Sequence, residues 1–93
     1  MEAEIAIQEF LEYVVAQLIK HPEEAGVLHE RKGNRHVYRI RLHPDDTGRV
    51  IGRGGKTISA IRSLVIAAAQ KNQIKVDVEL EDGAEEEIED PEG

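Results

Sequence analysis

The chain has 93 residues and a formal net charge of −7 at pH 7, and this length supports one modest hydrophobic core and therefore one domain. The absence of cysteine excludes a disulfide framework and a thiolate metal site, and it fits a reducing compartment, so we expect a cytoplasmic location. The first residues are acidic where a secretory signal would be basic, and polar residues interrupt the apolar positions from 5 to 19. We therefore expect no export signal and no membrane span.

Acidic residues are concentrated at the carboxyl end of the chain. Nine of the nineteen lie from Glu79 to Glu92, so residues 1–78 carry twelve basic and ten acidic side chains. Between Arg31 and Lys75 there are eleven Lys or Arg residues and only two acidic ones. Because affinity for phosphate depends on Lys and Arg, the negative net charge does not exclude a nucleic-acid partner for this basic central region.

Hydrophobic periodicity predicts the first three elements. Apolar residues recur at helical spacing from residue 3 to about residue 20, and His21-Pro22 should end that helix because the residue before a proline resists the helical conformation. Two strands are expected next, over 27–32 and 35–43. They are joined by Gly33-Asn34, a pair that can adopt the positive φ angles of a tight hairpin turn.

The second predicted strand alternates apolar and basic residues from 38 to 43, which predicts one apolar face and one strongly basic face. Pro44-Asp45-Asp46 indicates the start of a short helix, since proline is tolerated in the first turn and carboxylates are favourable near the positive end of the helix dipole. A long helix should follow from about 56 to 71, and alternation predicts a last strand from 74 to 80.

The predicted order is helix, strand, strand, helix, glycine loop, helix, strand. Three strands with one apolar face each must be covered, and three amphipathic helices on one side would cover them. We therefore expect a two-layer α+β domain over residues 1–81. Residues 82–93 are too acidic and too poor in apolar side chains to pack, so we expect a disordered tail.

Three glycines within four residues separate the last two predicted helices. Without Cβ atoms, the loop Gly52-Arg53-Gly54-Gly55 permits close approach of a sugar-phosphate backbone. The following helix begins with unpaired N–H groups and the positive end of its dipole, which favours a phosphate. Arg53 and Lys56 add positive charge beside that position, and Arg49 lies one turn upstream. The loop therefore predicts a phosphate-binding site, with a plain interhelical turn as the alternative.

Other glycine motifs do not fit this loop. A Walker A motif would need a glycine where Val50 stands, and a dinucleotide fingerprint would need its third glycine at Thr57. Asp45 and Asp46 could be imagined as a catalytic pair, but adjacent residues at a helix start point in different directions. The serines and threonines have no histidine nearby in sequence to suggest an activated nucleophile. We therefore expect a protein that is not an enzyme and that needs no cofactor.

Four histidines raise the question of a metal site. A two-residue turn at Gly33-Asn34 would set His29 opposite Tyr38 and His36 opposite Arg31, and these neighbours are poor metal ligands. We therefore expect no metal site.

Residues 50–58, Val-Ile-Gly-Arg-Gly-Gly-Lys-Thr-Ile, resemble the V-I-G-x-x-G-x-x-I signature of KH domains, whose GXXG loop clamps the backbone of about four nucleotides. The resemblance covers residues 3–80, and the order of elements is similar to the bacterial, type II KH fold. Leu11-Glu12-Tyr13, His21-Pro22-Glu23-Glu24 and residues 60–65 further resemble the small stand-alone KH proteins of the KhpA family.

The resemblance implies binding of single-stranded RNA in a narrow groove, and a role as a post-transcriptional regulator or RNA chaperone. The candidate RNA-binding residues form one wall at the loop and an opposite wall on the second strand: Arg49, Val50, Ile51, Gly52, Arg53, Gly54, Gly55, Lys56 and Ile58, then Val37, Arg39 and Arg41. The loop has no aromatic side chain, so bases cannot stack on rings there. We expect weak, loosely selective binding.

Two further questions stay open from sequence. KhpA-like proteins are associated with self-pairing and with a second KH-containing partner, so a homodimer or heterodimer is expected. The alternative function is a protein-interaction module with little RNA affinity of its own. The acidic tail either solvates the chain or competes with RNA for the basic surface.

Overall fold

The computed structural model describes residues 2–81 of the chain, so the predicted tail, residues 82–93, lies outside the described residues. The described part is an α+β domain with the predicted order α-β-β-α-α-β. Its main elements are α1 (Ala3–Leu18), β1 (Gly26–Lys32), β2 (Arg35–Arg41), α2 (Pro44–Ile51), α3 (Lys56–Lys71) and β3 (Lys75–Leu80). Two short 3₁₀ turns, η1 (Pro22–Glu24) and η2 (Arg53–Gly55), precede β1 and α3.

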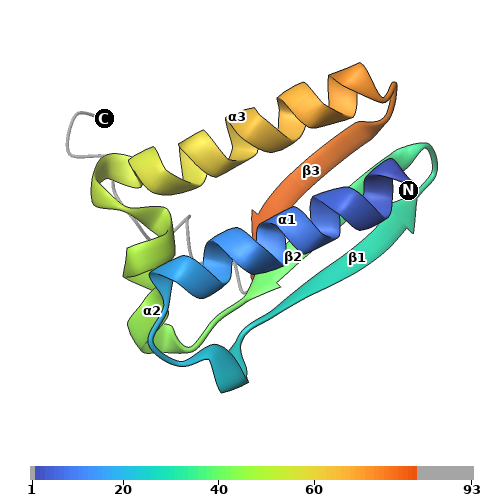
Figure 1. Ribbon diagram of the computed structural model, residues 1–93. Helices are drawn as coiled ribbons and strands as arrows, with labels where there is room; N and C mark the ends of the chain where they lie inside the picture. Colours follow the sequence, from blue (N-terminus) through green and yellow to red (C-terminus); the bar gives the residue numbers. More distant parts are fainter. Residues whose placement is uncertain (1, 82–93) are drawn as a thin grey trace.

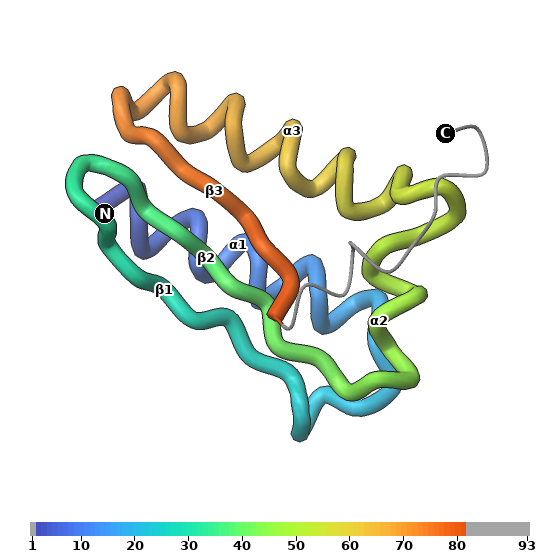
Figure 2. Tube along the Cα trace, turned by 180° about the vertical axis from the view of Figure 1, so that it is seen from behind, coloured from blue at the N-terminus to red at the C-terminus, as the bar shows by residue number. Residues whose placement is uncertain are grey.

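The three strands form one mixed sheet in the order β1-β2-β3. β1 and β2 are an antiparallel hairpin, whereas β3 pairs with β2 in parallel. The parallel pairing requires a crossover, which here consists of α2, η2 and α3. The helices cover one face of the sheet (Figure 1), and the opposite face is open when the molecule is seen from behind (Figure 2). The predicted two-layer α+β architecture is confirmed.

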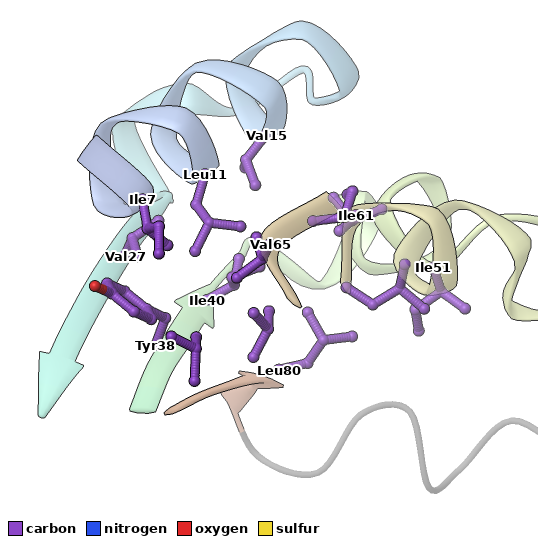
Figure 3. Close-up of a cluster of buried hydrophobic side chains, with 14 of the residues drawn as sticks. Ile7, Leu11, Val15, Val27, Tyr38, Ile40, Ile51, Ile61, Val65 and Leu80 are labelled. Atoms are coloured by element: carbon purple, nitrogen blue, oxygen red, sulfur yellow. The ribbon is translucent and has the colours of Figure 1, made fainter. Parts of the chain in front are cut away.

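The core lies between the helices and the sheet. Side chains of α1, of the sheet and of α3 meet there, as Figure 3 shows for Leu11, Ile40 and Val65. Tyr38 is fully buried among them, and its hydroxyl donates a hydrogen bond of 2.6 Å to the Glu4 carbonyl in α1. A buried tyrosine hydroxyl needs such a partner, so this bond fixes the first turn of α1 against the central strand.

Two element boundaries differ from the prediction by two residues. Helix α1 ends at Leu18, two residues earlier than expected, and the backbone amides of Lys20 and His21 donate hydrogen bonds to the Asp46 carboxylate. Strand β2 ends at Arg41 because His43 becomes the N-cap of α2, where its Nδ1 accepts a hydrogen bond from the Asp45 amide. At both positions a tertiary or capping hydrogen bond, and not the local sequence pattern, determines where the element ends.

The hairpin has the predicted register, with His29 opposite Tyr38 and His36 opposite Arg31. Gly33 alone of the two turn residues has a positive φ, of 62°. The two-residue turn therefore requires glycine at its first position and leaves Asn34 in an ordinary conformation.

The sequence predicted a strongly basic open face of the sheet, and this prediction is wrong. The arginines on this face are paired with carboxylates on neighbouring strands. Arg35 contacts Asp77 at 2.9 Å, and Arg39 lies 3.6 Å from Glu30 and 3.7 Å from Glu79. Val37 lies between these ion pairs in the register and is only 5% exposed. Basic and acidic side chains therefore alternate across the open face, because β3 places its acidic side chains beside the basic side chains of β2.

Candidate nucleic-acid interface

The glycine loop is an exposed bend between α2 and α3, as the sequence predicted. It starts at Gly52, whose φ of 77° and ψ of 170° lie in a region that is essentially restricted to glycine. A Cβ atom at this position would lie 2.7 Å from the Cβ of Thr57 and still closer to its hydroxyl oxygen. Gly52 is therefore required by the fold itself.

Gly54 and Gly55 differ from Gly52 in what surrounds them. Both have positive φ angles, 63° and 78°, but a Cβ atom built on either one would meet nothing within 4 Å. Their missing side chains leave space on the outside of the molecule, next to the exposed Arg53. This is the part of the loop that a polynucleotide backbone could approach closely.

The amides at the start of α3 are only partly available. The Gly55 amide donates to the Gly52 carbonyl at 3.1 Å, and the Lys56 amide donates to the Arg53 carbonyl. These internal bonds occupy donors that the sequence predicted to be unpaired. The first turn of α3 therefore offers fewer free backbone donors to a phosphate than the sequence predicted.

The cations near the loop fall into two groups. Arg53 and Lys56 are exposed, and in the described part of the chain neither has an ion-pair partner. Arg49 instead donates to the Asp46 carboxylate at 2.9 Å and to the Asp45 carbonyl at 2.8 Å. The Arg49 side chain is therefore already bound to acceptors in α2, whereas Arg53 and Lys56 are available for an anionic ligand.

Asp46 is a structural residue that the sequence reasoning did not identify. Its side chain is fully buried, and it accepts hydrogen bonds from the amides of Lys20 and His21 at 3.0 and 2.9 Å and from Arg49. Burial acts to raise the pKa of Asp46, but these two amides, His21 and Arg49 together hold the pKa below its ordinary value. The ionised carboxylate ties the end of α1 to the helix that leads into the glycine loop.

Four predicted RNA-binding residues have little accessible surface. Val50, Ile51 and Ile58 are 0%, 2% and 3% exposed and belong to the hydrophobic core. Val37 is buried under the ion pairs of the open face. These buried side chains leave little surface for a ligand, and their contact with RNA stays a prediction.

The structure also separates the second strand from the loop-bearing helices. β2 is the central strand, and β3 is the edge strand that lies alongside α3 (Figure 2). Arg62 of α3 donates a hydrogen bond of 3.0 Å to the Val78 carbonyl of β3, which joins the two elements directly. Arg39 and Arg41 of β2 are turned to the open face, where Arg41 contacts Glu81 at 3.1 Å. The expected opposite wall on β2 stays a prediction.

The histidines form two stacked pairs that the sequence reasoning missed. His29 Nε2 lies 2.8 Å from His36 Nδ1, diagonally across the predicted hairpin register. His21 and His43, which flank the hairpin in sequence, stack with ring centroids 4.2 Å apart. The second pair could not be found from local spacing, because it depends on how η1 approaches the start of α2.

No helix within residues 2–81 is both long enough and apolar enough to span a membrane.

Known proteins are similar to this chain over most of its length. The family model described as "KhpA/KhpB, KH domain" matches residues 8–80. The chain is 35% identical over 74 residues to the RNA-binding protein KhpA of Chlamydia muridarum, covering 80% of this chain and 95% of that protein. It is 34% identical over 76 residues to the RNA-binding protein KhpA of Bacillus subtilis, covering 82% and 94%. For the RNA-binding protein KhpA of Leifsonia xyli the identity is 40% over 68 residues, covering 73% and 90%. No solved structure matches significantly.

Proposed function

Because the chain belongs to the KhpA/KhpB family of KH domains, we propose that it binds single-stranded RNA and that the loop Gly52–Gly55 holds the sugar-phosphate backbone. Similar chains carry the name RNA-binding protein, which supports the class of ligand. The activity is binding without a chemical step. In the cell it would serve post-transcriptional regulation or RNA chaperoning.

One observation carries the assignment to the loop. Arg53 and Lys56 are exposed and unpaired within the described residues, and they flank two glycines whose outer side is open. Charge-assisted hydrogen bonds to a phosphate are among the stronger ones available to a protein surface. The loop tip therefore offers two mobile cations beside open space that a sugar-phosphate backbone can enter.

The other candidate residues have supporting roles in this proposal. Val50, Ile51 and Ile58 hold the loop through the core, and Arg49 holds α2 through Asp46. Arg39 and Arg41 of β2 would have to exchange their carboxylate partners for phosphates, which lowers their net contribution. With two unpaired cations and no aromatic ring in the loop, binding by one domain should be weak and tolerant of sequence.

The decisive experiment introduces negative charge at the loop tip. Arg53→Asp together with Gly54→Asp should abolish RNA binding and leave the fold intact, because a Cβ at Gly54 would meet no atom within 4 Å outside the adjoining backbone. The matched control is Arg31→Asp with Gly33→Asp in the hairpin turn, since Gly33 has nearly the same φ, 62° against 63°, and a Cβ there also meets nothing within 4 Å. Both double variants change the net charge equally.

Binding is measured by fluorescence anisotropy with a labelled single-stranded RNA, and folding by circular dichroism. A folded loop variant that binds as tightly as the parent chain would refute the proposal. Equal losses in the loop variant and the hairpin variant would show that net charge, and not the loop, governs affinity.

Association with another KH-containing chain is a second candidate function, and an apolar groove between α1 and α3 supports it. The groove has a volume of about 260 Å³, and its lining includes Phe10, Ala68 and Leu64, whose side chain is 59% exposed. An exposed apolar groove of this kind can form a protein interface. Leu64→Glu should then shift a dimer to monomer in sedimentation analysis, with little dependence on salt, whereas RNA binding should weaken steeply as salt rises.

A further inference from the structure

We propose that His21, His43 and Asp45 form a binding site for a divalent transition-metal ion of the Zn²⁺ class where η1 meets the start of α2. One ligand atom from each of these three residues lies within 4.8 Å of the other two. Imidazole nitrogens with a carboxylate oxygen are the donors that zinc takes in proteins, with water filling a remaining position. The site is separate from the glycine loop, which lies at the other end of α2.

Two distances converge on a single oxygen atom. His21 Nε2 and His43 Nδ1 each lie 3.8 Å from Asp45 Oδ2. Zinc–ligand bonds of about 2.0–2.2 Å place the ligand atoms of a tetrahedral site about 3.4 Å apart. The two distances to Asp45 Oδ2 are therefore within about 0.4 Å of the value for a tetrahedral site.

The second nitrogen of each ring has a carboxylate nearby. His21 Nδ1 lies 3.8 Å from Glu23 Oε1, and His43 Nε2 lies 3.5 Å from Glu24 Oε2. Metal-bound histidines commonly donate their other N–H to a carboxylate, which fixes the tautomer and raises the basicity of the ligand nitrogen. Both carboxylates come from η1, so this short turn would supply the outer partners for the whole site.

The charge of the cluster also favours a cation. Three carboxylates, Glu23, Glu24 and Asp45, surround two imidazole rings that stack at 4.2 Å with an interplanar angle of 24°. One divalent ion would compensate the charge of these carboxylates. Imidazole ligands favour zinc, copper or nickel over magnesium and calcium.

The surrounding structure holds the two histidines in place before an ion arrives. Asp46 accepts the His21 amide, and the Asp45 amide donates to His43 Nδ1 at 3.0 Å. The metal would take over the Nδ1 lone pair that now accepts this amide, so binding exchanges a helix-capping hydrogen bond for a coordinate bond. An occupied site would link η1 to the first turn of α2 directly.

Zinc titration of the full chain tests the inference. Isothermal titration calorimetry with ZnCl₂ should show one site per chain, and NMR should show shifts of the His21 and His43 ring signals without shifts of His29 and His36. His21→Gln and Asp45→Asn should each weaken zinc binding by at least about tenfold. His29→Gln, in the other stacked pair, is the matched control and should leave zinc affinity unchanged.

Either of two results would overturn the proposal. One is the absence of zinc binding up to millimolar concentration in the parent chain. The other is zinc binding that persists unchanged in both His21→Gln and Asp45→Asn, which would place the ion elsewhere, such as on the acidic carboxyl-terminal residues. Circular dichroism of each variant confirms that it remains folded, and His21→Gln keeps the α2 cap intact because His43 provides it.

Discussion

The contrast between unpaired and paired arginines leads to a quantitative prediction about salt. Replacing Arg53 and Lys56 by glutamine removes two cations that have no carboxylate partner among residues 2–81. Replacing Arg39 and Arg41 by glutamine removes the same net charge, but those side chains already contact Glu79 and Glu81. The two double variants therefore separate loop cations from sheet cations at equal net charge.

The expected magnitude follows from counterion release. Each phosphate neutralised on a single strand contributes a slope of about −0.7 to the plot of log affinity against log salt concentration. Losing two phosphate contacts should flatten this slope by about 1.4 in the loop variant. Between about 50 and 200 mM salt, the parent chain should then lose roughly sevenfold more affinity than the loop variant. The sheet variant should change the slope by less than about 0.7, because its arginines exchange one anion for another.

Fluorescence anisotropy at several salt concentrations measures both slopes on one labelled RNA. Equal flattening in the two variants would mean that the sheet contributes as many phosphate contacts as the loop. A larger effect in the sheet variant would reverse the assignment and move the main phosphate contact to β2. A larger slope change in the Arg53 and Lys56 variant than in the sheet variant agrees with the proposed site.

Three further predictions concern the loop, the core and the tail. Gly52→Ala should destabilise the fold by about 3 kcal/mol or more, because of backbone strain and the clash with Thr57. Gly54→Ala should cost only about 1 kcal/mol. Urea unfolding measures the free energy of unfolding of both variants, and equal costs would contradict the different roles of the two glycines. Burial and, secondly, Glu4 raise the pKa of Tyr38 to about 12, so the folded protein holds this proton more tightly than the unfolded chain. Its stabilising effect is complete below about pH 10 and is lost as the pH rises toward 12. Tyr38→Phe removes the hydrogen bond to Glu4 and should therefore lower the free energy of unfolding by about 0.5–1.5 kcal/mol at pH 7. If denaturant unfolding showed the same difference between variant and parent chain up to pH 12, the assigned pKa would be refuted. Truncation after Glu81 should tighten RNA binding at low salt if the acidic tail competes for the loop, and unchanged affinity would leave it a solvating segment.

Local patterns were sufficient for most of the fold. Helix α3 has the predicted bounds of 56 and 71, because a glycine loop precedes it and its apolar stripe is continuous. The hairpin register followed from a two-residue turn, and the alternation in β3 placed Val76, Val78 and Leu80 in the core. Each of these features depends on residues that are close in sequence, so spacing alone predicts them.

The errors arose where distant segments meet. The prediction of a strongly basic sheet face considered β2 alone, whereas the parallel crossover places Glu79 opposite Arg39. A signal was available in the sequence, because acidic residues occupy the outward phase of the last strand just as basic residues occupy that of the second. Once the two strands are paired in register, cross-strand attraction between opposite charges follows.

The contact between α1 and α2 could not be predicted from sequence for the same reason. One buried residue, Asp46, determines several features of the structure around this contact. The sequence related Asp46 only to the helix dipole, whereas its carboxylate is fully buried and accepts hydrogen bonds from the amides of Lys20 and His21. These bonds end α1 early and bring His21 next to His43, and the bond to Arg49 removes that arginine from the set of free cations. The same carboxylate thus leaves Arg53 and Lys56 as the available charges at the glycine loop and assembles the proposed metal ligands at the other end of α2.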